Sequence, residues 1–375
     1  MIYELLYPLR HIAGLGWLNV LRYPSFRAIM SALTAMIVSF VVAPWFISKL
    51  RGKQISQIIR EEGPASHQAK VGTPTMGGAL ILLSVLVPTV LWADVKNVFV
   101  IATTSVTAGY GAVGYIDDRL KIQEKSSRGL AGRYKLVGQF VIGALALGYL
   151  FYHASDLPPQ WLELRGRLAI PFLAFDKHPI ELPLPLYVFL ALVFVVWTSN
   201  AVNLTDGLDG LAIGPVIINA GTYSLWAYVA GSVLFGRPPA DYLDVAGFPE
   251  MVELAVYGAA VVGAGIGFLW YNTYPAQVFM GDVGSLALGG GLGMMAVITK
   301  TELLSVILGG IFTIEAVSVV TQVISFKLFK KRVFLMAPIH HHYEKKGWPE
   351  PRIIVRFWII SMLLALVALS SLKLR

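Results

Sequence analysis

Long apolar runs dominate this chain and limit what it can fold into. Ten runs of about 20 mainly apolar residues occur, the length that an α-helix needs to cross a bilayer. They cover approximately residues 26–48, 74–94, 97–116, 134–153, 185–204, 209–235, 250–270, 281–299, 303–326 and 353–373. Only 14% of the residues are charged, whereas a soluble domain carries about 25%. The sequence therefore predicts an all-α integral membrane protein with about ten transmembrane helices in a single domain, residues 1–375.

Positive charge is unevenly divided between the two sets of loops. The loops that join spans one and two, three and four, and so on along the chain hold 18 of the 30 Lys and Arg residues. Positively charged loops stay in the cytoplasm, so we expect these loops to be cytoplasmic and both termini to be periplasmic. The first apolar run lacks the small-residue cleavage pattern of a signal peptide, and we expect it to be retained as a span. The net charge of +8 does not indicate nucleic-acid binding, because the basic residues lie between apolar runs.

Four polar motifs fall in the loops expected on the cytoplasmic side. These motifs are Asp117-Asp118, Asn203 to Gly210, Asn272 to Asp282 and His340-His341-His342. Because all four lie at one lipid–water boundary, we expect them to line one cleft. Acids, amides and imidazoles in one cleft suit a reaction of a phosphorylated substrate with Mg²⁺. The chain contains no cysteine, which excludes thiolate catalysis and Cys-ligated metals.

The two acidic motifs also have structural interpretations. Asp117 and Asp118 could share a divalent cation, or they could be ordinary acids at a span end, neutralised by Arg119 and Lys121. The segment around Asp206 and Asp209, which includes two glycines, fits either a ligand-binding turn or a turn that ends a helix. Asp282 fits either a metal ligand or an N-cap, and a helix N-terminus there would also attract phosphate.

Other polar residues are weaker candidates. Consecutive imidazoles rarely point at one ion, so the three histidines favour phosphate over Zn²⁺. Lys70 and Thr75 lie where the second span begins and could hold phosphate or a base edge, or Lys70 could be a snorkelling lysine before a helix that starts with Pro. Glu315 and Gln322 lie within an apolar span, where polar groups are either functional or join neighbouring helices. The glycines between 263 and 267 lie in an apolar span without βαβ context, and we interpret them as helix-packing residues. Transporters place their polar groups near the membrane midplane, so the pattern favours an enzyme.

The combined motifs resemble the phospho-N-acetylmuramoyl-pentapeptide-transferase family, a branch of the polyprenyl-phosphate N-acetylhexosamine-1-phosphate transferases. The resemblance rests on Thr73 to Gly78, Asp117-Asp118, Asn203 to Gly210, Phe279 to Asp282 and Pro338 to His342. It implies an enzyme of the bacterial inner membrane that transfers phospho-N-acetylmuramoyl-pentapeptide from its UDP carrier to undecaprenyl phosphate, giving lipid I and UMP, with Mg²⁺ as cofactor. The alternatives are a related transferase for N-acetylglucosamine 1-phosphate and a non-enzymatic transporter. A homodimer is compatible with the resemblance, and the sequence leaves the oligomeric state open.

The resemblance also implies roles at the matched positions. The expected catalytic residues are Asp117, Asp118, Asp282, Lys135, His340 and His341, with Asp118 and Asp282 as metal ligands. The expected substrate-binding residues are Lys70, Thr75, Asn203, Asp206, Asp209, Asn272, Phe279, Gln322 and His342. Within this set, we expect the ring of Phe279 to stack on uracil.

Overall fold

The computed structural model describes residues 2–52, 72–124, 129–152, 157–233 and 236–372. The long helices are α2 (Pro24–Gly52), α3 (Gly78–Trp92), α4 (Val98–Gln123), α5 (Gly132–Tyr152), α7 (Leu184–Thr205), α8 (Ile213–Gly231), α10 (Glu253–Asn272), α11 (Gly281–Ile298), α13 (Gly310–Phe329) and α15 (Glu350–Ser370). Shorter helices are α1 (Ile2–Leu6), η1 (Tyr7–His11), η2 (Gly16–Arg22), α6 (Pro159–Leu164), α9 (Pro239–Leu243), η5 (Pro249–Val252), α12 (Glu302–Leu308) and α14 (Ile339–Lys345). The strands β1 (Arg167–Leu168) and β2 (Ile180–Glu181) form a two-stranded antiparallel ribbon.

The helices confirm an integral membrane architecture. Among the described residues, eight helices are long and apolar enough to cross a bilayer, and α3 is a shorter apolar helix of 15 residues. The ten predicted runs all coincide with helical segments, but the run 303–326 was wrongly predicted as continuous. It is divided into α12 and α13 at Gly309. A Cβ atom on Gly310 would lie 2.7 Å from a methyl carbon of Leu364 on α15, so the break lies where two helices approach closely.

Helix α11 forms the centre of the bundle. All of its residues except Gly281 and Asp282 are buried, and it packs against α4 and α7 along much of its length. Small residues allow this close packing, because they let helix backbones approach one another. The same holds for α10, where a Cβ on Gly263 would lie 2.0 Å from the carbonyl oxygen of Ala32 in α2. The prediction that the glycines of 263–267 serve helix packing is confirmed.

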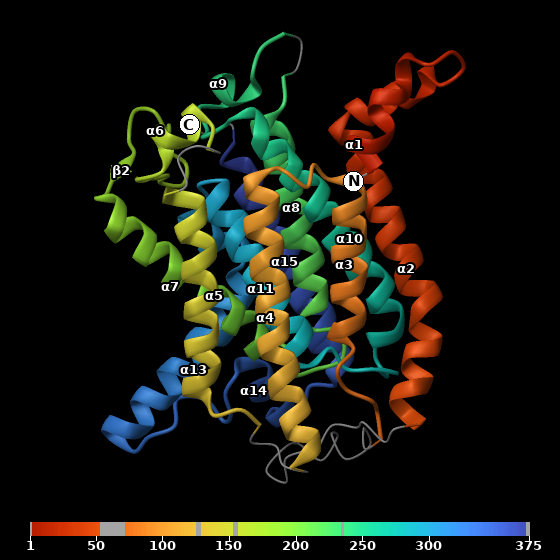
Figure 1. The fold of residues 1–375 in the computed structure, drawn as a ribbon. Coiled ribbons are helices and arrows are strands. Elements are labelled where there is room, and N and C mark those ends of the chain that lie inside the picture. Colours follow the sequence, from red (N-terminus) through yellow and green to blue (C-terminus); the bar gives the residue numbers. More distant parts are fainter. Residues whose placement is uncertain (1, 53–71, 125–128, 153–156, 234–235, 373–375) are drawn as a thin grey trace.

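The polar motifs gather at one end of the bundle. The C-terminal ends of α4 and α7, the start of α11 and the short helix α14 lie at the lower end in Figure 1. Helices α1, α6 and α9 and the β-ribbon lie at the opposite end, as does the C-terminal end of α15. The fold thus brings together residues from four separate parts of the chain.

A main-chain seam fixes the entry to α3 against the entry to α11. Phe279 N–H donates to the carbonyl oxygen of Pro74 (2.8 Å), Gly77 N–H to that of Phe279 (2.8 Å) and Gly78 N–H to that of Met280 (2.7 Å). A Cβ on Gly78 would lie 2.0 Å from the backbone nitrogen of Gly284, so only glycine permits this approach. The seam places the first turn of α11 beside the segment that carries Thr75.

The opposite end contains a buried lysine. Lys300, between α11 and α12, is 1% exposed, and its Nζ lies 4.1 Å from the ring centroid of Tyr187 and 4.6 Å from that of Trp161. The Nζ donates to the carbonyl oxygen of Arg165 at 3.3 Å. Burial lowers the pKa of this amine to about 7. The lysine joins the segment around α6 to the ends of α7 and α11.

Candidate active site

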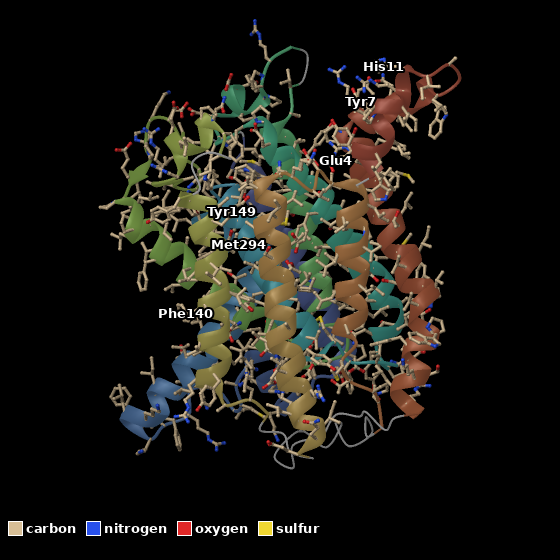
Figure 2. All side chains as sticks on the ribbon, in the orientation of Figure 1. Glu4, Tyr7, His11, Phe140, Tyr149 and Met294 are labelled. Carbon is tan, nitrogen blue, oxygen red and sulfur yellow. The ribbon has the colours of Figure 1, made fainter. Side chains whose placement is uncertain are left out.

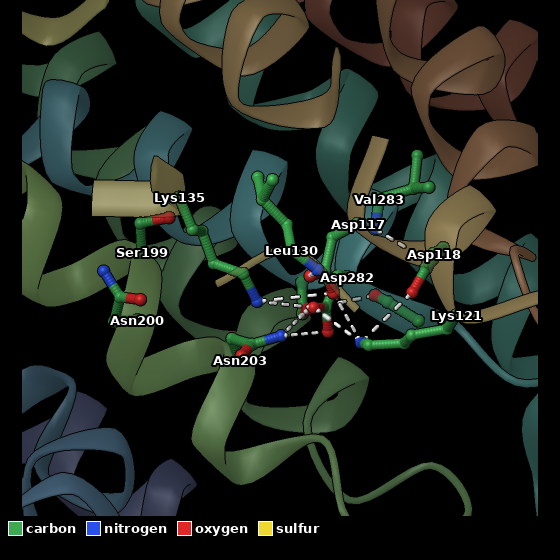
Figure 3. A network of polar contacts seen from close by, with 12 residues as sticks. Asp117, Asp118, Lys121, Leu130, Lys135, Ser199, Asn200, Asn203, Asp282 and Val283 are labelled. Atoms are coloured by element: carbon green, nitrogen blue, oxygen red, sulfur yellow. Dashed lines mark hydrogen bonds and ion pairs between the residues drawn. The ribbon is translucent and has the colours of Figure 1, made fainter. Parts of the chain in front are cut away.

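Three aspartates from two helices converge at the lower end of the bundle. Asp117 and Asp118 lie near the end of α4, and Asp282 is the second residue of α11. One carboxylate oxygen from each lies within 4.8 Å of the others, and Figure 3 shows the three side chains pointing toward a common point. Asp117 and Asp118 are buried and Asp282 is partly exposed. Clustered carboxylate oxygens are the ligands that Mg²⁺ prefers, so this donor set could hold a divalent cation.

Two lysines neutralise part of this charge. Lys121 Nζ lies 2.5 Å from Asp117 Oδ2, 2.9 Å from Asp282 Oδ2 and 3.5 Å from Asp118 Oδ1. Lys135 Nζ, from α5, lies 2.6 Å from Asp282 Oδ2 and 3.5 Å from Asp117 Oδ2. Three carboxylates beside two ammonium groups leave a formal negative charge, which a cation would offset. The donors and the net charge of the cluster therefore both fit a metal ion.

Lys121 is the residue that sequence reasoning missed. The sequence predicts for it only the neutralisation of acids at a span end, whereas the structure places it in contact with all three carboxylates. Its spacing of four residues from Asp117 and three from Asp118 was the available signal, because such residues face each other on a helix.

Backbone and amide groups hold each carboxylate in place. Asn203 Nδ2, at the end of α7, donates to Asp282 Oδ1 at 2.7 Å and to Ser285 Oγ at 2.8 Å. Leu130 N–H donates to Asp117 Oδ1 at 2.8 Å. Val283 N–H, in the first turn of α11, lies 3.3 Å from Asp118 Oδ2. The positive end of the α11 dipole thus faces a carboxylate.

Gly281 allows the sharp turn from the preceding loop into α11 that brings these groups together. It adopts φ +71°, a conformation that favours glycine. A Cβ atom there would also lie 2.5 Å from Asp118 Oδ2 and 3.1 Å from Thr75 Oγ1. The structure therefore places the predicted residue Thr75 beside the aspartate cluster.

Asp206 lies at the edge of the cluster, directly after α7. Its carboxylate accepts a backbone hydrogen bond from Gly281. Burial, reinforced by the negative charges of Asp282 and Asp118, raises the pKa of Asp206 well above its usual range. A divalent cation bound by the three aspartates would make the net charge beside Asp206 positive instead of negative.

The three histidines face different partners. His340 is fully buried, and its Nδ1 lies 3.0 Å from Glu315 Oε2. Its Nε2 faces the chain at Gly207, where a Cβ would lie only 2.3 Å away. His341 Nδ1 lies 2.6 Å from Glu344 Oε2. The histidine segment thus contacts the loop that contains Asp206, and a polar residue within α13 supports it.

Two predicted substrate-binding residues join loops to one another. Asn272 accepts a hydrogen bond from Gly210 N–H at 3.0 Å and donates to the carbonyl oxygen of Val278 at 2.9 Å. Asp209 accepts from Ala276 N–H at 2.9 Å. Both side chains are buried, so they fix the loop after α7 against the loop after α10.

The remaining predicted residues contact other parts of the chain or lie outside the described residues. Phe279 belongs to the main-chain seam and its side chain is partly exposed. Gln322 makes hydrogen bonds to backbone groups of Val333 and Phe334, in the loop between α13 and α14. His342 Nδ1 accepts from Leu335 N–H at 3.1 Å. Lys70 lies outside the described residues.

Comparison with known proteins identifies the family of this chain. The sequence profile described as Glycosyl transferase family 4 matches residues 100–300, which include Asp117, Asp118 and Asp282. The fold and the site thus define a membrane-embedded glycosyl transferase. The chain is 69% identical to the phospho-N-acetylmuramoyl-pentapeptide-transferase of Sorangium cellulosum, 54% to that of Anaeromyxobacter sp. (strain K) and 53% to that of Geobacter sp. (strain M21), each over the full length of both chains. The chain belongs to the phospho-N-acetylmuramoyl-pentapeptide-transferase family.

Proposed function

We propose that this transferase moves phospho-N-acetylmuramoyl-pentapeptide from UDP-N-acetylmuramoyl-pentapeptide to undecaprenyl phosphate, releasing UMP and lipid I, with Mg²⁺ as its cofactor. The observation that carries the proposal is the cluster of three carboxylates and two lysines at one end of an apolar bundle. A lipid phosphate and a soluble nucleotide can meet only where the bilayer joins water, and the position of this cluster at one end of the apolar bundle supports such a meeting point.

The proposed topology has about ten spans with both termini in the periplasm. The eight long apolar helices, with α3 and α8 as two further crossings, give an even number of passes. The excess of Lys and Arg in the loops on the site side favours a cytoplasmic site. The location is then the bacterial inner membrane, where the soluble UDP-linked substrate is available.

The proposed chemistry exchanges one phosphoanhydride for another. An oxygen of the lipid phosphate attacks the sugar-linked phosphorus, and the bond from that phosphorus to the UMP oxygen breaks. Asp118 and Asp282 would hold the cation with Asp117 beside them, and bound Mg²⁺ supplies positive charge against the diphosphate. Lys121 and Lys135 would face the phosphoryl oxygens and reduce the repulsion between two anions. His341 would contact phosphate from the side of α14, and the buried His340, held by Glu315, would position that helix.

Direct attack fits this site better than a covalent phospho-aspartate. The lipid phosphate is already largely ionised at neutral pH, because the second pKa of a phosphate monoester is about 6. A strong general base is therefore unnecessary, and Asp117 would position the attacking phosphate. Incubation with the UDP-linked donor alone tests this step: radiolabelled phosphate retained on the protein would overturn direct attack.

The overall proposal is tested with purified protein in nanodiscs. Supplying the UDP-linked donor, undecaprenyl phosphate and Mg²⁺ should yield UMP and an organic-extractable sugar in equal amounts. UDP-N-acetylglucosamine serves as the matched donor control and should yield neither product. Absence of UMP release with the muramoyl donor, or release only with the control donor, would contradict the proposal.

A further inference from the structure

The C-terminal half of α13 extends beyond the packed bundle. No residue of this helix after Ser318 is buried, and Leu328 and Phe329 are 70% and 68% exposed. In Figures 1 and 2 this end of the helix stands away from its neighbours at the lower left, with side chains projecting on several sides. With a rise of 1.5 Å per residue, residues 319–329 extend about 16 Å past the last buried side chain. The described residues therefore leave the surface of this projecting segment uncovered.

A cluster of cations ends the projecting segment. Lys327, Lys330, Lys331 and Arg332 lie within six residues, and all four are exposed. The stretch 316–343 contains no Asp or Glu, so nothing in the local sequence offsets this charge. Apolar side chains precede the cluster and follow it: Phe326 is 48% exposed and Val333 is 53% exposed. This arrangement, with apolar flanks and a charged tip, is typical of a segment at the boundary between acyl chains and headgroups.

The cationic tip has a defined shape. Lys330 adopts a left-handed conformation with φ +55° and ends the helix, and its N–H donates to the carbonyl oxygen of Phe326 at 3.1 Å. The Ser325 hydroxyl donates to the carbonyl oxygen of Lys331 at 3.0 Å. The turn 327–332 is therefore closed onto the end of its own helix, and it presents its cations together.

The loop that follows this turn, residues 333–338, connects it to α14, which carries the three histidines. Gln322 accepts from Val333 N–H (3.0 Å) and Phe334 N–H (2.9 Å), and it donates to the Phe334 carbonyl oxygen (3.1 Å). Leu335 N–H then donates to Nδ1 of His342 at 3.1 Å. A displacement of the turn would be transmitted through these bonds to α14.

We propose that the turn 327–332 is a docking site for the headgroups of anionic phospholipids. The charge of the turn is complementary to a phosphodiester headgroup, and its apolar flanks fit the acyl region just beneath. Binding of an acidic protein would require exposed polar side chains around these cations. Here the surrounding exposed side chains are Val, Ile, Leu and Phe. Docking would hold the end of α13 at the membrane surface, and through the loop 333–338 it would hold α14 near the aspartate cluster.

The absence of cysteine in the chain allows a direct test. A fluorophore on L328C, introduced into the full-length protein in nanodiscs, reports which lipids contact the tip. Phosphatidylglycerol and phosphatidylcholine that carry the same quencher are compared. Each basic residue near an anionic surface changes partitioning about fivefold. We therefore expect stronger quenching by phosphatidylglycerol, and a loss of at least fivefold in this preference when K330Q/K331Q is added.

Two further variants separate a specific site from general charge. K330R/K331R keeps the charge and should retain the preference. K49Q/R51Q removes the same charge from the end of α2, at the same end of the bundle, and should also retain it. Raised salt should weaken the preference, because exposed charges are screened. Equal quenching by the two lipids, or a preference that survives K330Q/K331Q, would overturn the proposal. The readout requires no turnover, so its failure would leave the proposed reaction untouched.

Discussion

Replacing Gly114 by alanine tests the contact between α4 and α11 that the site depends on. The added Cβ would lie 2.2 Å from the carbonyl oxygen of Asp282, 2.4 Å from its carbonyl carbon and 2.6 Å from the nitrogen of Val283. Ordinary van der Waals contact begins at 3.4 Å. The neighbours are backbone atoms that cannot rotate away, so the first turn of α11 must move by about 1 Å.

That movement would separate Asp282 from the groups that hold it. Its carboxylate contacts Lys135 at 2.6 Å, Asn203 at 2.7 Å and Lys121 at 2.9 Å. A misplacement of about 1 Å at a reacting centre costs roughly 100-fold in rate, and overpacking costs about 1–3 kcal/mol of stability. We therefore expect Gly114→Ala to reduce UMP release about 100-fold and to lower the melting temperature.

Gly148→Ala on α5 is the matched control. A Cβ there has no atom within 4 Å, so turnover should be unchanged and stability should be equal or higher by up to about 1 kcal/mol. UMP release and thermal unfolding are measured on both purified variants. Wild-type turnover and stability in Gly114→Ala would refute the close crossing of α4 and α11 and the positional argument built on it.

Three further predictions concern Asp282, Glu315 and Lys300. Asp282→Asn should abolish Mg²⁺-dependent UMP release while thermal unfolding stays near that of the wild type; retained metal-dependent turnover would remove Asp282 from the metal site. Glu315→Gln removes the charged partner of His340 Nδ1, a hydrogen bond worth about 1.5 kcal/mol, and should reduce kcat about tenfold while KM stays near that of the wild type; an unchanged kcat with lowered thermal stability would assign Glu315 a purely structural role. Lys300 has a folded pKa of about 7 against an ordinary 10.5, so between these values the unfolded chain binds more protons and stability should rise with pH. In Lys300→Met this rise should disappear from unfolding measurements made across that range, and an equal rise in both proteins would contradict the assignment.

The parts of the site that the sequence could predict are those with a local signal. Long apolar runs locate the helices, and the position of each polar motif at a run end indicates that Asp117, Asp118 and Asp282 share one boundary. The structure brings these three together. The break at Gly309 was not predictable from hydropathy, because both halves of the run 303–326 are apolar; it lies where Gly310 closely approaches Leu364 of α15.

Residues that act through long-range backbone contacts leave no such signal. Asn272 and Asp209 are of residue types that often bind ligands, yet they form hydrogen bonds with main-chain groups of neighbouring loops. Which loop an amide faces is determined by tertiary packing, and periodicity along the chain does not encode it. Lys121 is intermediate: its helical spacing indicates contact with Asp117 and Asp118, but its contact with Asp282 depends on how α4 meets α11.

The main-chain seam between residues 74–78 and 279–280 sets the order in which the site can be made. About 200 residues separate its two sides, so a ribosome completes α3 long before the partners of Gly77 and Gly78 have been synthesised. A nascent chain that stops before α11 already contains Asp117, Asp118 and Lys121, but it lacks the third carboxylate and the backbone that positions it. The cluster of three aspartates can therefore form only after α11 has been synthesised, and a fragment that ends before α11 lacks the complete cluster.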